Sequence, residues 1–488
     1  MSAAAISMSN WQETHLPPAD DQPATQYASN LNNSKAVEKI PVEIWHRILG
    51  FAISCTLLPG EDDDYYHGQA IRDLDCIMVA DYKRSEIIRT KLRLVCRQWD
   101  QFLDNFSDRL VQLTPDAPMG YWPPVKRWDR VIRIQGPHNI FCTCKHSCWP
   151  PFDRKGDALS KGNLLRPVPP RLQSQIRETV LPQLSNQCKA ILWPGVWQDD
   201  FVDPERFDSV IMFAHAFRDS EHATKQAAII SSTYMRLTHL EFWMPSLCNP
   251  SFYLSLERLE TLRIYTEKTD GDLEPKVASD THSVGKWHLP SLRSLSVWIV
   301  AWTENDVRAF NMLLHQIGKG LTGLYMCDLT EDSVTGHPVI SENTWSWLPS
   351  LEVVGTNLKH ISLMPAPRKG TRSPITLLID GETNLINHIP PRQVLEDIRK
   401  NWSLSATGEV IVNEPWSEMI RAIEDDEAWL GQGLHDSEID VLDVLHAIGT
   451  GLRDSEGVPF QERIRRQLHV ALTNQKRRAA EEKLSASP

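Results

Sequence analysis

Apolar residues recur at helical spacing in two stretches near the start of the chain. In the first, from Ile40 to Ala52, they return every three or four residues, and the opening Ile-Pro-Val-Glu suits a helix N-terminus. The second, LRLVCRQWDQFLDNF (92–106), keeps the same rhythm without Pro or Gly. Each stretch predicts one helix. Between them, residues 59–90 begin with an acidic run and predict an insertion that holds a short helix around 71–82.

A different pattern, of the general form L-x-x-L-x-Φ with Φ apolar, recurs in the middle of the chain. Its alternation predicts short strands that bury every second residue in a shared core. The five units begin at Leu237, Leu259, Leu292, Leu321 and Leu358. Weaker copies occupy 128–134, 188–193 and 374–380, and 304–318 predicts an outer helix. Helices combined with short strands place the chain in the mixed α/β (α+β) fold class.

Composition and charge narrow the classes of function. With 488 residues, 41% hydrophobic and 23% charged, the chain is typical of globular proteins and not of fibrous or wholly disordered ones. Nine cysteines are sparse and odd in number, which predicts reduced thiols and a cytoplasmic or nuclear location. The net charge of −12 argues against binding to nucleic acid by the body as a whole. Apolar runs are too short to predict a membrane span.

The two ends of the chain differ from its middle. Residues 1–36 are polar and rich in Pro and Asn, which predicts a disordered leader. From 406 to 488 the strand pattern fades into an acidic segment, followed by predicted helices over 438–449 and 460–484. The last helix is basic, and we interpret its arginines as a solvated face rather than an import signal or a phosphate contact.

Candidate catalytic and metal-binding motifs are few. Three cysteines and two histidines are clustered within residues 138–148, and thiolate and imidazole groups are the usual ligands of zinc. The Cys-x-Cys spacing in this cluster differs from that of the usual zinc knuckle, and a further ligand, Cys188, is distant in sequence. We therefore predict a loop with incidental thiols, with no metal and no cofactor. The cluster consists of His138, Cys142, Cys144, His146 and Cys148. Walker-type, HExxH, GxSxG and CxxC motifs are missing from the sequence, which predicts a protein without catalytic activity.

The two predicted N-terminal helices resemble an F-box. That family carries Leu-Pro-x-Glu-Ile on its first helix and Leu-x-x-Val-Cys-x-x-Trp on a later segment. Here Ile40-Pro41-Val42-Glu43-Ile44 matches the first motif, with Ile in place of Leu, and Leu92, Val95-Cys96-Arg97 and Trp99 match the second. The resemblance is confined to residues 40–106, and its two halves normally lie much closer together in sequence.

The resemblance implies an organisation and a set of partners. The F-box would cover 37–110 with an insertion at about 59–90, and 111–405 would form an irregular leucine-rich-repeat-like solenoid that binds a target protein. An F-box docks a Skp-type adaptor, which links it to a cullin–RING (SCF-type) ubiquitin ligase. The matched adaptor-binding positions are Ile40, Pro41, Ile44, Trp45, Ile48, Leu49, Val95, Cys96 and Trp99. Two alternatives stay open: a leucine-rich-repeat scaffold without any ubiquitin role, and a metal-dependent enzyme built on the cysteine cluster.

The predicted strands also suggest where a target would bind. Residues that alternate with the core positions would share the opposite face of the sheet, where three aromatic residues would stack as a ladder beside polar ones. Aromatic anchors with polar neighbours are typical of protein-binding hot spots. A covering loop or terminal segment would instead make the ladder internal packing. The residues concerned are Trp243, Tyr265 and Trp298, with Glu241, Arg263 and Ser296 beside them.

Overall fold

The computed structural model describes a large part of the chain, in several ranges. They are residues 40–55, 57–58, 71–112, 125–135, 174, 176–184, 186–196, 208–217, 219–266, 284–299, 304–328, 340–341, 343–356, 375–379, 407–412, 416–417, 420, 452–454 and 457–486. The predicted leader, the cysteine cluster, the repeat unit at Leu358 and the helix over 438–449 lie outside these residues. The chain divides into two compact units, Met1–Ser54 and Cys55–Pro488, which are described separately.

The first unit contains the predicted N-terminal helix. Helix α2 (Val42–Ala52) follows Pro41 at its N-cap, and Glu43 lies in its first turn, where a negative charge stabilises the helix dipole. Pro41 has no amide hydrogen to lose, and its carbonyl accepts hydrogen bonds from the amides of Ile44 (3.0 Å) and Trp45 (3.3 Å). The sequence prediction of a helix here is therefore confirmed.

In the second unit, the two helices before the sheet differ from the prediction. Helix α3 (Ile71–Arg93) is much longer than the short helix expected over 71–82, and helix α4 (Arg97–Asp104) is shorter than the one expected over 92–106. The predicted helix is broken because the chain turns after Arg93 and Cys96 adopts an extended N-cap conformation (φ −160°, ψ 163°). Apolar spacing continues across this turn, so the periodicity alone did not reveal it.

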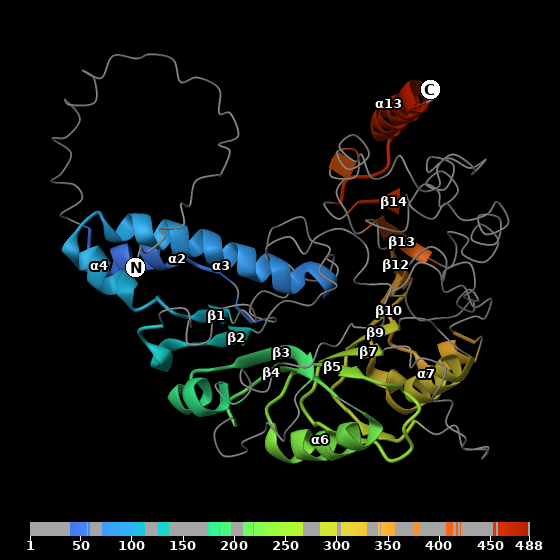
Figure 1. Ribbon diagram of the computed structural model, residues 1–488, viewed down its shortest axis with the longest axis horizontal. Coiled ribbons are helices and arrows are strands. Elements are labelled where there is room, and N and C mark those ends of the chain that lie inside the picture. The colour runs from blue at the N-terminus through green and yellow to red at the C-terminus, as the bar shows by residue number, and fades with distance from the viewer. Residues whose placement is uncertain are drawn as a thin grey trace. The chain divides into compact units, whose positions relative to one another are not determined.

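Parallel strands form the body of the second unit (Figure 1). In the part of the chain that the structure describes, twelve strands pair in chain order and all neighbours are parallel. The strands are β1 (Leu110–Gln112), β2 (Arg133–Gln135), β3 (Ala190–Val196), β4 (Met212–Ala216), β5 (His239–Met244), β7 (Thr261–Thr266), β9 (Ser294–Ile299), β10 (Gly323–Asp328), β11 (Val353–Thr356), β12 (Ile375–Ile379), β13 (Thr407–Val412) and β14 (Leu452–Arg453). Strands β6 (Tyr253–Ser255) and β8 (Lys286–His288) form a separate parallel pair. The mixed α/β class is confirmed, with a largely parallel sheet.

The predicted repeat strands lie at the expected places. The units beginning at Leu237, Leu259, Leu292 and Leu321 overlap β5, β7, β9 and β10, and the weaker copies overlap β2, β3 and β12. Short helical turns also occur: η3 (Trp128–Arg130), η4 (Ile176–Val180), η5 (Leu181–Gln183), η7 (Gly318–Gly320) and η8 (Thr344–Trp347).

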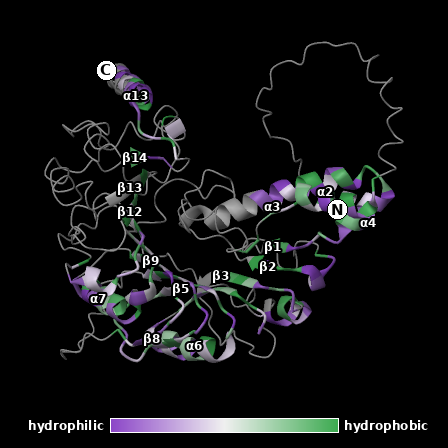
Figure 2. Ribbon diagram, turned by 180° about the vertical axis from the view of Figure 1, so that it is seen from behind, coloured by the Kyte–Doolittle hydropathy of each residue, from purple (hydrophilic) through white to green (hydrophobic). Residues whose placement is uncertain are grey.

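Two helices cover one face of the parallel sheet. Helix α6 (Ser220–Thr233) and the predicted helix α7 (Glu304–Ile317) share a core with alternate residues of the strands. That core is apolar, and Figure 2 shows hydrophobic residues concentrated on the strands. Helix residues of the core include Ala227, Ile230, Phe310 and Leu313, and strand residues include Leu240, Phe242, Leu262, Ile264, Leu295 and Val297.

The predicted C-terminal helix is present as α13 (Glu462–Ala486). Its first half packs into the core through Leu468 and Ala471. Just before it, the buried Asp454 carboxylate accepts hydrogen bonds from the amides of Trp416 (3.0 Å) and Val458 (2.6 Å), so the turn that follows β14 is fixed to Trp416. Among the described helices, none is both long enough and apolar enough to cross a bilayer.

Candidate protein-binding surfaces

Helix α2 carries an apolar row that faces solvent. Ile44, Ile48 and Phe51 are spaced four and three residues apart and are 42%, 47% and 83% exposed. The neighbouring positions Leu49 and Ile53 are each 1% exposed. A helix of a soluble protein usually buries its apolar stripe and leaves polar residues outside, so an exposed apolar row indicates a surface for a partner.

The end of α3 and the turn that follows it expose a second group of apolar side chains. Leu94 is 84% exposed, Ile87 and Val95 are each 59% exposed, and Ile88 is 36% exposed. The turn is held by the amides of Leu94 and Val95, which donate to the carbonyls of Lys91 (3.2 Å) and Leu92 (3.1 Å). The backbone of this turn is therefore ordered by its own hydrogen bonds, while its side chains point away from the unit.

The candidate adaptor-binding residues differ in their exposure. Leu49 is buried and Ile40, Trp45 and Trp99 are partly buried, whereas Pro41, Ile44, Ile48, Val95 and Cys96 are exposed. Four exposed apolar residues, Phe51, Ile87, Ile88 and Leu94, are not among the positions that the sequence motifs indicate. Phe51 could have been found, because it continues the row of Ile44 and Ile48 by one helical step.

The opposite face of α3 is buried and polar. Arg89 is 7% exposed and donates to both carboxylate oxygens of Glu86 (2.9 and 3.0 Å from Nε) and to the carbonyl of Leu103 in α4 (3.4 Å). Burial raises the pKa of Tyr82 to about 12, and the guanidinium of Arg109 lies 5.9 Å from the centre of its ring. These contacts hold α3 against α4 and against the residues that lead into β1.

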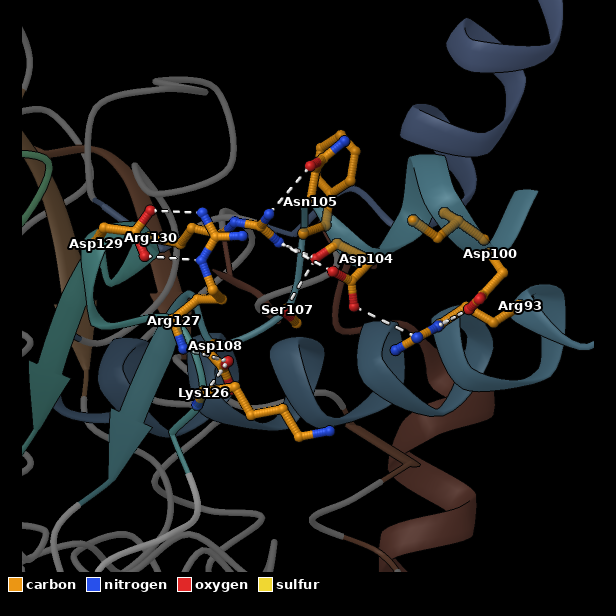
Figure 3. Close-up of polar contacts among 12 residues, drawn as sticks. Arg93, Asp100, Asp104, Asn105, Ser107, Asp108, Lys126, Arg127, Asp129 and Arg130 are labelled. Atoms are coloured by element: carbon orange, nitrogen blue, oxygen red, sulfur yellow. Dashed lines mark hydrogen bonds and ion pairs between the residues drawn. The ribbon is translucent and has the colours of Figure 1, made fainter. Parts of the chain in front are cut away.

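An ionic network extends this junction toward the sheet (Figure 3). Arg93 of α3 pairs with Asp100 (2.5 Å) and Asp104 (3.3 Å) of α4. Asp104 also pairs with Arg130 of η3 (3.5 Å), which donates to the side-chain oxygen of Asn105 (3.2 Å). The network therefore links α3, α4 and the segment that enters β2.

A nearby backbone contact strengthens the same junction. Asp108 adopts a positive φ of 60°, an uncommon backbone conformation that Asp tolerates better than most residues. Its carboxylate accepts hydrogen bonds from the amides of Lys126 and Arg127, both at 3.2 Å. The chain leaving α4 is thus fixed to the chain entering η3.

On the face of the sheet away from α6 and α7, the three aromatic candidates stack in register. Trp243 pairs with Tyr265, and Tyr265 with Trp298. The ring centroids are 4.6 Å apart at 11° in the first pair and 6.0 Å apart at 23° in the second. All three are buried, at 4%, 4% and 6% exposure, in a cluster that also includes Leu58. The predicted ladder is present in the sheet, but it is packed and not open to solvent.

The polar candidates beside the ladder are buried as well. Arg263 donates to Glu241 at 3.1 Å, and Ser296 accepts a hydrogen bond from the indole of Trp298 at 2.8 Å. Glu241 and Arg263 are 8% and 7% exposed, and Ser296 is fully buried. On this face of the sheet, Glu241 and Arg263 therefore form a buried ion pair, and the hydroxyl of Ser296 is buried and hydrogen-bonded.

The described residues offer no metal site. Within the ranges given above, no group of three or more His, Cys, Asp or Glu side chains is arranged to hold a metal ion. Burial raises the pKa of Cys188 to about 12, so its thiol stays protonated at neutral pH.

Comparison with known proteins does not assign the chain to a family. The chain matches no protein-family model, and no curated protein matches it.

Proposed function

We propose that this chain is the substrate-recognition subunit of an SCF-type ubiquitin ligase, with an F-box that docks a Skp-type adaptor and a leucine-rich-repeat-like body that binds a target protein. The receptor would supply no catalytic group. It would act by holding target lysines near a ubiquitin-charged partner, which raises their effective concentration.

The exposed row on α2 is the observation that carries the proposal. The F-box-like motif at Ile40–Ile44 lies at the start of this helix, and the row of Ile44, Ile48 and Phe51 continues from it. An amphipathic helix that presents residues at such spacing is the usual partner of an apolar groove. The exposed Leu94 and Val95, within the span of the second motif, support the same role.

The body supports the second half of the proposal. Parallel strands paired in chain order, with helices on one face, are typical of solenoids that bind proteins over extended surfaces. The burial of the stack of Trp243, Tyr265 and Trp298 favours internal packing over direct contact with the target. Target recognition would then use other residues of the body.

The test is binding to purified Skp-type adaptor, measured by calorimetry on the full-length chain. Ile44→Asp combined with Ile48→Asp places two charges in the exposed row, and we expect a loss of affinity of about 30-fold or more, as for hot-spot residues. Val470→Asp is the matched control, because Val470 is an apolar residue of α13 with 54% exposure. Circular dichroism confirms that each variant is folded.

The outcomes separate the two candidate functions. Binding by the wild type and the control, but not by the double variant, supports the receptor. A folded wild-type chain that does not bind the adaptor would refute the proposal. The alternative, a leucine-rich-repeat scaffold without a ubiquitin role, would then take its place.

A further inference from the structure

A histidine of strand β4, one residue before the end of the strand, lies in the apolar core. His215 is 1% exposed and faces the layer that contains helix α6. Its ring lies 5.8 Å from Phe213 and 5.4 Å from Phe217, and the ring of His222, on α6, is 6.0 Å away. Two imidazoles therefore lie next to each other between strand and helix at this point.

The imidazole of His215 lacks the partners that a buried polar ring normally has. Among the described residues, neither of its ring nitrogens forms a hydrogen bond. A buried polar group without a hydrogen bond destabilises the folded state, whereas Leu or Phe at the same place would not. Unlike Leu or Phe, an imidazole has a nitrogen that can take up a proton near neutral pH.

The surroundings of His215 disfavour its protonation. Burial first, and the charge of His222 second, lower the pKa of His215 to about 3. Asp219 is the N-cap of α6 and Glu221 lies in its first turn, and the Asp219 carboxylate accepts a hydrogen bond from the His222 amide (2.8 Å). Neither acid is among the groups that shift His215.

Among the side chains that the structure describes, the strands on either side of β4 place no compensating charge on this face. Strand β5 contributes Leu240 and Phe242 to the helix-side core, while its charged Glu241 lies on the opposite face, paired with Arg263. Strand β3 contributes Ile191. A protonated His215 would therefore face apolar side chains and a second histidine.

We propose that His215 and His222 form a pH-sensitive latch between β4 and α6, which loosens in mildly acidic conditions. When α6 separates from the sheet, both imidazoles reach water and His215 accepts a proton. The open state is then favoured by proton uptake, while the closed state keeps His215 neutral.

The sign and size of the effect follow from linkage. In the open state His215 titrates near pH 6.5, and in the closed state its pKa is depressed, so stability is full above about pH 6.5 and is lost as pH falls toward 3. For one histidine, the opening equilibrium constant rises about 8-fold between about pH 7.0 and 5.5, and about tenfold per pH unit below that.

Hydrogen exchange of the full chain tests the latch without any partner, so the result is independent of the proposed receptor function. Protection factors of α6 peptides (220–233) are compared at about pH 7.0 and 5.5, after correction for intrinsic exchange rates. We expect an approximately 8-fold loss of protection in the wild type and no loss in His215→Leu. His288→Gln, at a side chain that is 61% exposed, is the control and should behave as the wild type does.

Two results would overturn the latch: protection of α6 that does not change with pH in the wild type, or a loss that persists in His215→Leu. If circular dichroism shows that His215→Leu does not fold, His215→Phe replaces it. Phe keeps an aromatic ring next to Phe213 and Phe217 but cannot take up a proton, so the same expectation applies.

Discussion

The ring of Tyr325, in β10, occupies the space where a side chain of Gly355 would begin. A Cβ atom added to Gly355, its direct neighbour in β11, would lie 2.2 Å from Cδ1 and 2.9 Å from Cε1 of the ring. The other edge of the ring is close to Gly323, whose added Cβ would lie 3.1 Å from Cε2. The ring of Tyr325 therefore fits in this place because positions 323 and 355 are glycines, and Gly355→Ala forces the ring to move.

The expected magnitude is the balance of two effects. Overpacking a filled site destabilises the folded state by about 1–3 kcal/mol, whereas replacing a strand glycine by alanine stabilises it by about 0.5–1 kcal/mol. We expect Gly355→Ala to lower the free energy of unfolding by up to about 2.5 kcal/mol. In a Tyr325→Ala background the ring is gone, and the same change should become neutral or stabilising by about 0.5–1 kcal/mol.

A double-mutant cycle measured by denaturant unfolding checks this reasoning. The four proteins are the wild type, the two single variants and the double variant, compared by their unfolding midpoints at unchanged m-values. The decisive quantity is the change of sign between the two backgrounds. If Gly355→Ala destabilises the protein equally with and without the Tyr325 ring, the steric explanation is wrong.

Three further predictions concern polar contacts. Glu241→Ala leaves Arg263 buried without its carboxylate, so we expect a loss of about 3–5 kcal/mol in denaturant unfolding, much of it recovered when Arg263→Ala is added. Asp454→Ala removes the acceptor of the Trp416 amide and should cost about 1.5–3 kcal/mol, seen as earlier proteolysis of 462–486. Arg93→Ala breaks a half-exposed network, so its cost should stay below about 1 kcal/mol and shrink further at high salt in thermal unfolding.

The sequence predicted the repeat strands well because their signal is local. Each unit places two leucines and an apolar residue at fixed spacing, and four of the five units are strands where the structure describes them. Strand β4 was missed because its sequence, Met-Phe-Ala-His-Ala, carries no leucine and is buried along its whole length, which hides the alternation. Helix α6 was missed because it is rich in Ala, Ser and Thr, which make a weak apolar stripe.

The candidate sites were predictable only in part. Spacing identified the row of Ile44 and Ile48 on α2, and strand register identified the stack of Trp243, Tyr265 and Trp298. Alternation assigns residues to a face, but it does not tell whether another segment covers that face. The burial of the stack therefore required the structure.

Among the described residues, each strand of the twelve-stranded sheet pairs with the next strand of that sheet along the chain, and this has a consequence for how such a protein changes during evolution. Strands β5, β7, β9 and β10 begin at residues 239, 261, 294 and 323, at unequal intervals, yet they pair residue for residue. The register is thus set within the strands and not by the length of the connections. Insertions and deletions between strands can accumulate without shifting the ladder, so new connecting segments can be tried by mutation while the scaffold that carries them is inherited unchanged.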